Sequence, residues 1–186
     1  MILGALELGS IAAGFEVLDV TVKAAMVSII MAEPVYPGKF LILFTGDVAS
    51  VTASVQKGKE MANGFLVDQL IIPNLHRQVE LLLMGEKIDA SREVVGILEG
   101  YTALSAIRAS DIACKVSDVK MLDMKLANEI GGKSFFLISG SIEDVEASIE
   151  AAAKEEQRRG FLLKRVVIPN PHPDIQGYLG VKNGIK

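Results

Sequence analysis

The segment GFLVDQLIIPNLH (64–76) resembles GFLLKRVVIPNPH (160–172) later in the chain, and this internal repeat is the strongest indication of the fold. The two segments share 7 identical positions at an offset of 96 residues. Each consists of a glycine, an apolar run and a proline, which is typical of a strand that follows a helix and ends at the proline. A chain that repeats such a segment is best divided into copies of one structural unit before single motifs are considered.

The repetition extends over most of the 186 residues. GALELGSIAAGFEVLDV (4–20) resembles GILEGYTALSAIRASDI (96–112) at an offset of 92 residues, and GKFLILFTG (38–46) resembles GKSFFLISG (132–140) at an offset of 94. The second repeat therefore carries two short insertions, one in the loop before Gly132 and one in its long second helix. The sequence predicts tandem domains at residues 1–88 and 93–186, with the polar stretch around residues 84–92 as the linker.

Each repeat shows the same order of elements. The first is expected to contain strands at 2–8, 26–33, 40–46 and 65–73 and amphipathic helices at 9–25 and 47–64. Ser10 and Asp47 are the expected N-caps of the two helices, and PVYPGK (34–39) is expected to be a loop between two strands. The order β-α-β-β-α-β predicts an α+β fold of two ferredoxin-like domains, in which two helices cover one face of each sheet.

Composition and charge exclude several classes of protein. Half of the residues are hydrophobic, which is ample for a core and suggests further apolar surface between subunits. The net charge of -4 comes without a basic block, which argues against nucleic-acid binding. No apolar run reaches the roughly 18 residues of a spanning helix, and MILGALELGS (1–10) lacks the basic region of a signal peptide. The one cysteine, Cys114, excludes an internal disulfide and favours a cytoplasmic location.

An ordered set of short motifs resembles the bacterial microcompartment shell domain. The set comprises G-x-L-E (4–7), D-x-x-x-K-A-A (19–25), a loop ending in glycine, G-D-V (46–48) and I-P-N-x-H (72–76). No single motif is specific, whereas the ordered set, found in both repeats, covers nearly the whole chain. Two unpermuted domains in one chain resemble the tandem-domain, trimer-forming shell proteins. VYPGKF (35–40) and EIGGKSFF (129–136) most resemble the T-type trimers of propanediol-utilisation compartments.

This resemblance implies a structural protein and not an enzyme. Three chains would form a homotrimeric, pseudohexameric tile that joins other shell proteins edge to edge in the shell of a cytoplasmic compartment. A central pore would pass small polar metabolites by passive diffusion. The loops between the two central strands of each domain would line it, through Val35, Tyr36, Pro37, Gly38, Ile130, Gly131 and Gly132.

Tyr36 departs from the pattern of the propanediol T-type trimers. In those proteins a cysteine precedes P-G-K, and three such cysteines bind an iron–sulfur cluster at the axis. A phenol is a poor substitute for a thiolate, and Cys114 is expected to be a small core residue. The sequence therefore predicts no cofactor and no metal site. A trimer with an iron–sulfur or other metal site in the pore, serving electron transfer, stays as the alternative.

The resemblance also places residues of both repeats along the tile edge: Lys23, Lys115, Asn74, His76, Asn170 and His172. The lysine stem would pack against a neighbouring tile while its ammonium finds carbonyl oxygens. The two histidines lack a neighbouring cysteine or carboxylate cluster in sequence, so an edge contact is favoured over catalysis. The family commonly has arginine at the two asparagine positions, so this chain lacks a fork of donors at each edge.

Two other features receive structural interpretations. The repeat-paired carboxylates Glu7 and Glu99, and Asp19 and Asp111, could suggest acid–base chemistry, but no nucleophile or metal-binding spacing accompanies them. The segment EDVEASIEAAAKEEQRRG (143–160) is expected to be a solvated helix face.

A ferredoxin-like trimeric sensor is a further alternative, but the glycine loop or basic cluster that usually binds its effector is absent from the sequence.

Overall fold

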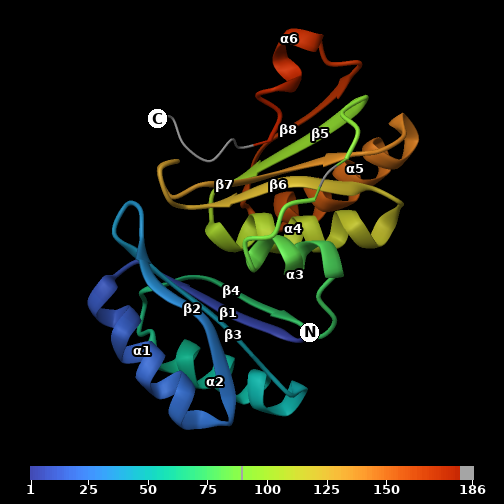
Figure 1. Ribbon diagram of the computed structural model, residues 1–186. Helices are drawn as coiled ribbons and strands as arrows, with labels where there is room; N and C mark the ends of the chain where they lie inside the picture. The colour runs from blue at the N-terminus through green and yellow to red at the C-terminus, as the bar shows by residue number, and fades with distance from the viewer. Residues whose placement is uncertain (89, 181–186) are drawn as a thin grey trace. The chain divides into compact units, whose positions relative to one another are not determined.

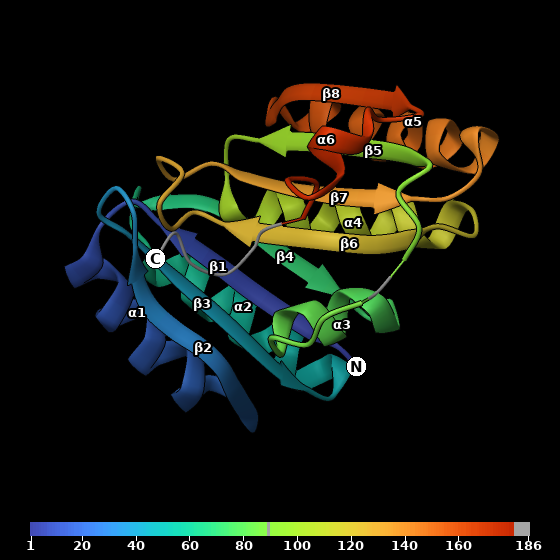
Figure 2. The same cartoon turned by 45° about the horizontal axis from the view of Figure 1, so that its top comes forward.

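The computed structural model describes residues 1–88 and 90–180, and it contains the element order β-α-β-β-α-β twice (Figures 1 and 2). This order confirms the predicted α+β fold of two tandem domains. The first repeat contains β1 (Leu3–Leu8), α1 (Ile11–Ala24), β2 (Val27–Val35), β3 (Lys39–Gly46), α2 (Val48–Met61) and β4 (Leu66–Ile72). The second contains β5 (Val94–Gly100), α4 (Ala103–Val116), β6 (Lys120–Leu126), β7 (Ser134–Ser139), α5 (Ile142–Arg159) and β8 (Leu162–Pro169).

Each repeat forms one four-stranded sheet. The strand orders are β2-β3-β1-β4 and β6-β7-β5-β8, so equivalent strands occupy equivalent places. The two central strands of each sheet pair antiparallel, and each first strand also pairs antiparallel with the last strand of its repeat. In the first repeat, α1 and α2 pack on each other and on the sheet. Among residues 1–88 and 90–180, no helix is long and apolar enough to cross a membrane.

The predicted caps start both helices of the first repeat. Ser10 Oγ accepts a hydrogen bond from the Ala13 N–H at 3.3 Å, which satisfies one of the free donors at the start of α1. Asp47 Oδ1 accepts one from the Ser50 N–H at 2.8 Å at the start of α2. These two side chains therefore fix where each helix begins, as the sequence predicts.

The first helix of each repeat packs on its sheet through a pair of residues whose sizes differ between the repeats but balance each other. A Cβ on Gly14 would lie 2.3 Å from Phe40 Cβ, so only glycine lets α1 approach the sheet at this point. In the second repeat the equivalent residues are Ala106 and Ser134, and the Ala106 N–H donates to Ser134 Oγ at 3.0 Å. A larger residue on the helix is thus matched by a smaller one on the strand.

The predicted loop at 34–39 is shorter than expected. Pro34 pairs with Phe40 and Val35 pairs with Lys39, so β2 runs to Val35 and the turn comprises residues 36–38. Because β2 lies at the edge of the sheet, a proline without an N–H is tolerated there.

A helix that the sequence analysis did not identify, α3 (Arg77–Leu83), follows the first repeat. Its Val79 is fully buried. A short helix of four residues, α6 (Pro173–Gln176), follows the second repeat at the equivalent place.

The chain divides into two compact units that are not the same as the repeats. The first unit comprises residues 1–75 with 102–104 and 126–133; the second comprises residues 76–101, 105–125 and 134–186. Each unit is therefore completed by short segments from the other repeat. The boundaries of the repeats at 1–88 and 93–186 stay a prediction.

Candidate pore loop and assembly surfaces

The turn Tyr36-Pro37-Gly38 connects the edge strand β2 to the central strand β3. Gly38 has a φ of +98°, and its N–H donates to the Val35 oxygen at 3.0 Å, which closes the turn. An L-residue rarely adopts this φ, so glycine is required at the tip. Tyr36 is 60% exposed, whereas Val35 is only 4% exposed. The turn therefore presents the tyrosine to solvent and keeps the Val35 side chain in the interior.

The loop of the second repeat at residues 126–133 belongs to the same compact unit as this turn. The Tyr36 N–H donates to Asn128 Oδ1 at 3.1 Å. A Cβ on Gly132 would lie 2.5 Å from Pro37 Cδ, so glycine allows close contact of the two loops. The structure thus brings together Tyr36, Pro37 and Gly132, three of the predicted pore-lining residues. Asn128, which the sequence analysis missed, fixes the turn from the side of the longer loop.

A buried ion pair supports both loops from behind. Lys39 Nζ lies 2.8 Å from Glu7 Oε1 and also donates to the Gly132 oxygen at 3.3 Å. Glu7 is fully buried in β1, and its other carboxylate oxygen accepts from the Leu104 N–H at 3.4 Å. Burial raises the pKa of Glu7, while the Lys39 ammonium and the Leu104 N–H oppose that rise. Glu7 is used here to hold the loops in place, which agrees with the structural role expected for it.

Asp111 on α4 joins two of the predicted edge residues within the second compact unit. Its Oδ1 accepts from the His76 N–H at 2.8 Å and its Oδ2 lies 2.6 Å from Lys115 Nζ. His76 Nδ1 accepts from the Gln78 N–H at 3.4 Å, so the imidazole caps α3. The Gln78 side chain continues this contact, donating to the Val119 oxygen and accepting from the Met121 N–H, each at 2.8 Å. The segment that follows I-P-N-L-H is thereby fixed against α4 and β6.

The repeat equivalents of Asp111, Lys115 and His76, which are Asp19, Lys23 and His172, are exposed. Asp19 and Lys23 form the same ion pair at 2.6 Å on α1, but the Asp19 side chain is 58% exposed where that of Asp111 is 8% exposed. His172 caps α6 through an N–H from Asp174 and is 71% exposed. Asn74 and Asn170 are also exposed. Among the predicted tile-edge positions, the lysine and histidine positions and the aspartate that contacts them therefore differ between the repeats in what covers them, whereas the two asparagines do not.

The described residues do not fit an iron–sulfur cluster. Cys114 is buried in α4, and its burial, with Asp111 nearby, raises the pKa of the thiol to about 12. A thiol that stays protonated at neutral pH is a poor metal ligand. Tyr36, which takes the place of the ligand cysteine, offers a phenol. Across residues 1–88 and 90–180, no group of three or more histidine, cysteine, aspartate or glutamate side chains is placed to hold a metal ion.

Comparison with known proteins gives a consistent result. The family model of the BMC domain matches residues 3–75 and 94–171. The chain is 36% identical over 170 residues to the bacterial microcompartment shell protein PduT of Citrobacter freundii, covering 91% of this chain and 92% of that protein. It is 26% identical to the carboxysome assembly protein CcmO of a Synechocystis strain, covering 88% of this chain and 59% of that protein. Among solved structures, a microcompartment protein from Desulfitobacterium hafniense superposes with a TM-score of 0.81 and 38% identity, covering 95% of this chain and 98% of that one.

Proposed function

Because the chain belongs to the BMC-domain family and is a structural protein of a bacterial microcompartment shell, not an enzyme, we propose that it works as a homotrimeric tile with a central pore. Six domains then surround the axis, two from each chain. The contacts between chains are heterologous, since a closed threefold ring joins two different surfaces of the same protein.

One observation supports the trimer: a hydrogen bond between the two repeats forms within the chain at one pair of residues, while the repeat-equivalent pair does not form it within the chain. His76 donates to Asp111, and the repeat equivalents of this pair are His172 and Asp19. Both equivalents are exposed. In the proposed trimer the His172 N–H of one chain donates to Asp19 of the next, so each chain offers one donor and one acceptor around the ring.

The pore lip consists of the exposed parts of the two loops. Tyr36 and Pro37 come from the first repeat, and Ile130 and Gly131 come from the second. Val35 does not contribute a side chain, because it is buried, and Gly132 supports the turn from behind. Tyrosine hydroxyls both donate and accept hydrogen bonds, so a ring of them suits the passage of small polar metabolites.

The predicted edge residues keep a role at the rim of the tile. In the proposed trimer, the outer rim of the tile carries the side chains of the predicted edge residues: Lys23, Lys115, Asn74, Asn170, His76 and His172. There they meet neighbouring tiles formed by the same or other shell proteins, with the lysine stems packed and the ammonium groups bonded to carbonyl oxygens.

The trimer is tested by mass and by imaging. Native mass spectrometry and light scattering at micromolar concentration are expected to give three times the chain mass of 19.9 kDa. Electron microscopy at high concentration is expected to show hexagonal sheets or tubes. A stable monomer in both solution measurements would refute the proposal.

The pore lip is tested by variants of Tyr36. Tyr36→Ala is expected to raise the conductance of the trimer in a planar lipid bilayer by about twofold or more, because three large side chains leave the opening. Tyr36→Phe keeps the ring and removes the hydroxyl, so conductance should change little while the preference for polar solutes falls.

The control for this experiment is Tyr178→Ala, which removes an exposed tyrosine outside the loops. It should behave like the unaltered protein in both conductance and solute preference. Equal conductance of Tyr36→Ala and Tyr178→Ala would show that Tyr36 does not line the opening.

A further inference from the structure

The loop of the second repeat closes in the same way as the turn of the first repeat, but it is longer. The Gly38 N–H donates to the Val35 oxygen at 3.0 Å, and the Gly132 N–H donates to the Ala127 oxygen at 3.1 Å. The bonded residues are three positions apart in the first repeat and five positions apart in the second. The second repeat therefore has two additional residues between equivalent bonds.

The two additional residues are Asn128 and Glu129, because Ile130 corresponds to Tyr36 at the offset of 94 residues that applies from here onward. Glu129 has a φ of +64°, a conformation that is costly for a residue with a Cβ. Residues held in such conformations concentrate at functional sites. Asn128 is exposed, and its Oδ1 accepts from the Tyr36 N–H at 3.1 Å. The insertion thus supplies an acceptor that reaches the turn of the first repeat.

Three contacts join the turn to the loop of the same chain, and all of them lie in the first compact unit. The first is the hydrogen bond between Asn128 and Tyr36. In the second, Gly132 lies against Pro37 so closely that a Cβ on the glycine would be 2.5 Å from the proline Cδ. In the third, Lys39 Nζ donates to the Gly132 oxygen at 3.3 Å. The turn and the loop are therefore held together within one chain.

Fewer of these contacts can form in the proposed trimer between the loop of one chain and the turn of the next. Gly131 takes the place of Pro37 there and has no ring to pack. The first repeat has no residue equivalent to Asn128, so the Ile130 N–H meets no counterpart of that acceptor. The lysine contact has an equivalent, through Lys133. The two segments of one chain are thus joined more firmly than segments of neighbouring chains.

We propose that Asn128 is a positioning residue of the pore, which keeps the Tyr36 side chain at the opening by holding the backbone of its turn. The lip then consists of three lip pairs, each formed by residues 36–38 and 126–133 of one chain. The lip is least constrained where neighbouring chains meet. This inference rests on the proposed trimer and its pore, and it adds a residue that sets the aperture without being one of the predicted lining residues.

Hydrogen exchange of single amides, measured on the trimer by mass spectrometry with electron-transfer fragmentation, tests the bond. Asn128→Ala removes the acceptor, so exchange of the Tyr36 amide is expected to become about three- to tenfold faster. Asn128→Asp keeps an acceptor oxygen and should stay within about twofold of the unaltered protein. In the unaltered trimer the Tyr36 amide should exchange more slowly than the equivalent Ile130 amide, after correction for their intrinsic rates.

Conductance of single trimers in a planar lipid bilayer tests the effect on the pore. Asn128→Ala is expected to raise the conductance toward that of Tyr36→Ala, because the released turn no longer keeps the ring at the opening. In a protein that already carries Tyr36→Ala, the same substitution should add no further increase. This non-additivity is expected only if Asn128 acts through Tyr36.

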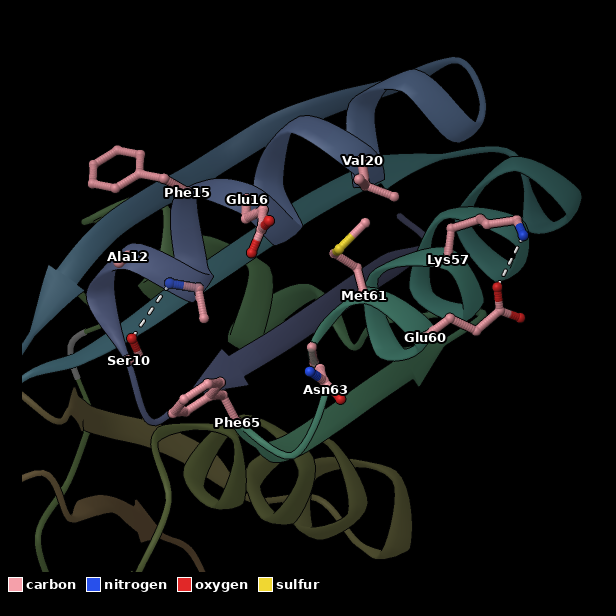
Figure 3. Close-up of a pocket in the computed structure, with 12 residues that line it drawn as sticks. Ser10, Ala12, Phe15, Glu16, Val20, Lys57, Glu60, Met61, Asn63 and Phe65 are labelled. Carbon is pink, nitrogen blue, oxygen red and sulfur yellow. Dashed lines mark hydrogen bonds and ion pairs between the residues drawn. The ribbon is translucent and has the colours of Figure 1, made fainter.

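The matched control is Asn63→Gly, which removes a side-chain amide elsewhere in the first compact unit. Asn63 is exposed and lines the groove between α1 and α2 that Figure 3 shows, together with residues 10–20 and 57–65. Glycine readily adopts its φ of +43°. Exchange of the Tyr36 amide and conductance should both match those of the unaltered protein.

The outcomes separate this inference from the proposed function. An unaltered protein that is monomeric, or that forms no conducting trimer, overturns the proposed function and this inference with it. If the trimer conducts but Asn128→Ala leaves conductance unchanged, or raises it equally with and without Tyr36, the pore stands and the role of Asn128 is refuted. Exchange as fast in Asn128→Asp as in Asn128→Ala, or an Ile130 amide as slow as that of Tyr36, would also refute it.

Discussion

Replacing Arg108 with alanine is expected to lower the free energy of unfolding by about 3–5 kcal/mol, because it leaves the Glu156 carboxylate buried without its cation. The Arg108 guanidinium nitrogen Nη1 lies 2.9 and 3.2 Å from the two carboxylate oxygens of Glu156, and Glu156 is fully buried. Urea unfolding followed by circular dichroism at one fixed protein concentration measures the effect, since assembly makes apparent stability depend on concentration.

Two further variants separate the buried charge from the lost packing. Arg108→Met with Glu156→Leu removes both charges and keeps similar volume, so it should regain most of the lost stability. Arg158→Ala removes an exposed arginine that pairs with Glu155 at 2.7 Å, and it should have little effect. A double variant as unstable as Arg108→Ala would show that packing of the arginine, and not the unpaired carboxylate, explains the loss.

The Glu156 pair also marks a limit of the sequence analysis. The expectation that residues 143–160 form a solvated face is wrong for one side of α5. That side buries Val145, Ile149, Ala152 and Glu156 at helical spacing. The apolar stripe was visible in the sequence, but its last member is a glutamate, which binary patterning assigns to solvent. Its cation lies 48 residues away on another helix, and no local pattern indicates that pairing.

The fold and the turn of the candidate pore loop could be predicted because their signals are local. The repeated strands, glycines and caps are local features, and their order fixed the β-α-β-β-α-β assignment. Tyr36 and Gly38 could be placed on the turn because it joins two recognisable strands. The role of Asn128 could not be predicted, because this residue lies in the insertion of the second repeat. Its side-chain oxygen accepts from the Tyr36 N–H across 92 residues of sequence, and no local pattern indicates such a contact. α3 was missed because no equivalent of its length follows the second repeat.

Replacing Asp19 with alanine is expected to weaken each contact between chains by about 1.5–3 kcal/mol while leaving the single chain folded. That range is the usual contribution of a hydrogen bond to a charged group, and the proposed trimer has one such bond from His172 at each of its contacts. Within the chain Asp19 makes only a surface ion pair with Lys23, which contributes about 0–1 kcal/mol. Mass photometry should therefore show monomers at concentrations where the unaltered protein is a trimer.

The repeat supplies the matched control for this experiment. Asp111→Ala removes the acceptor of the His76 N–H and the partner of Lys115 inside the chain, so it should lower the melting temperature of the chain itself. Asp19→Asn keeps an oxygen acceptor and should retain part of the trimer. If the Asp19→Ala protein is still a trimer but has a lower melting temperature, Asp19 stabilises the fold of its own chain and not the contact between chains. The chain that supplies His172 would then have to bind elsewhere.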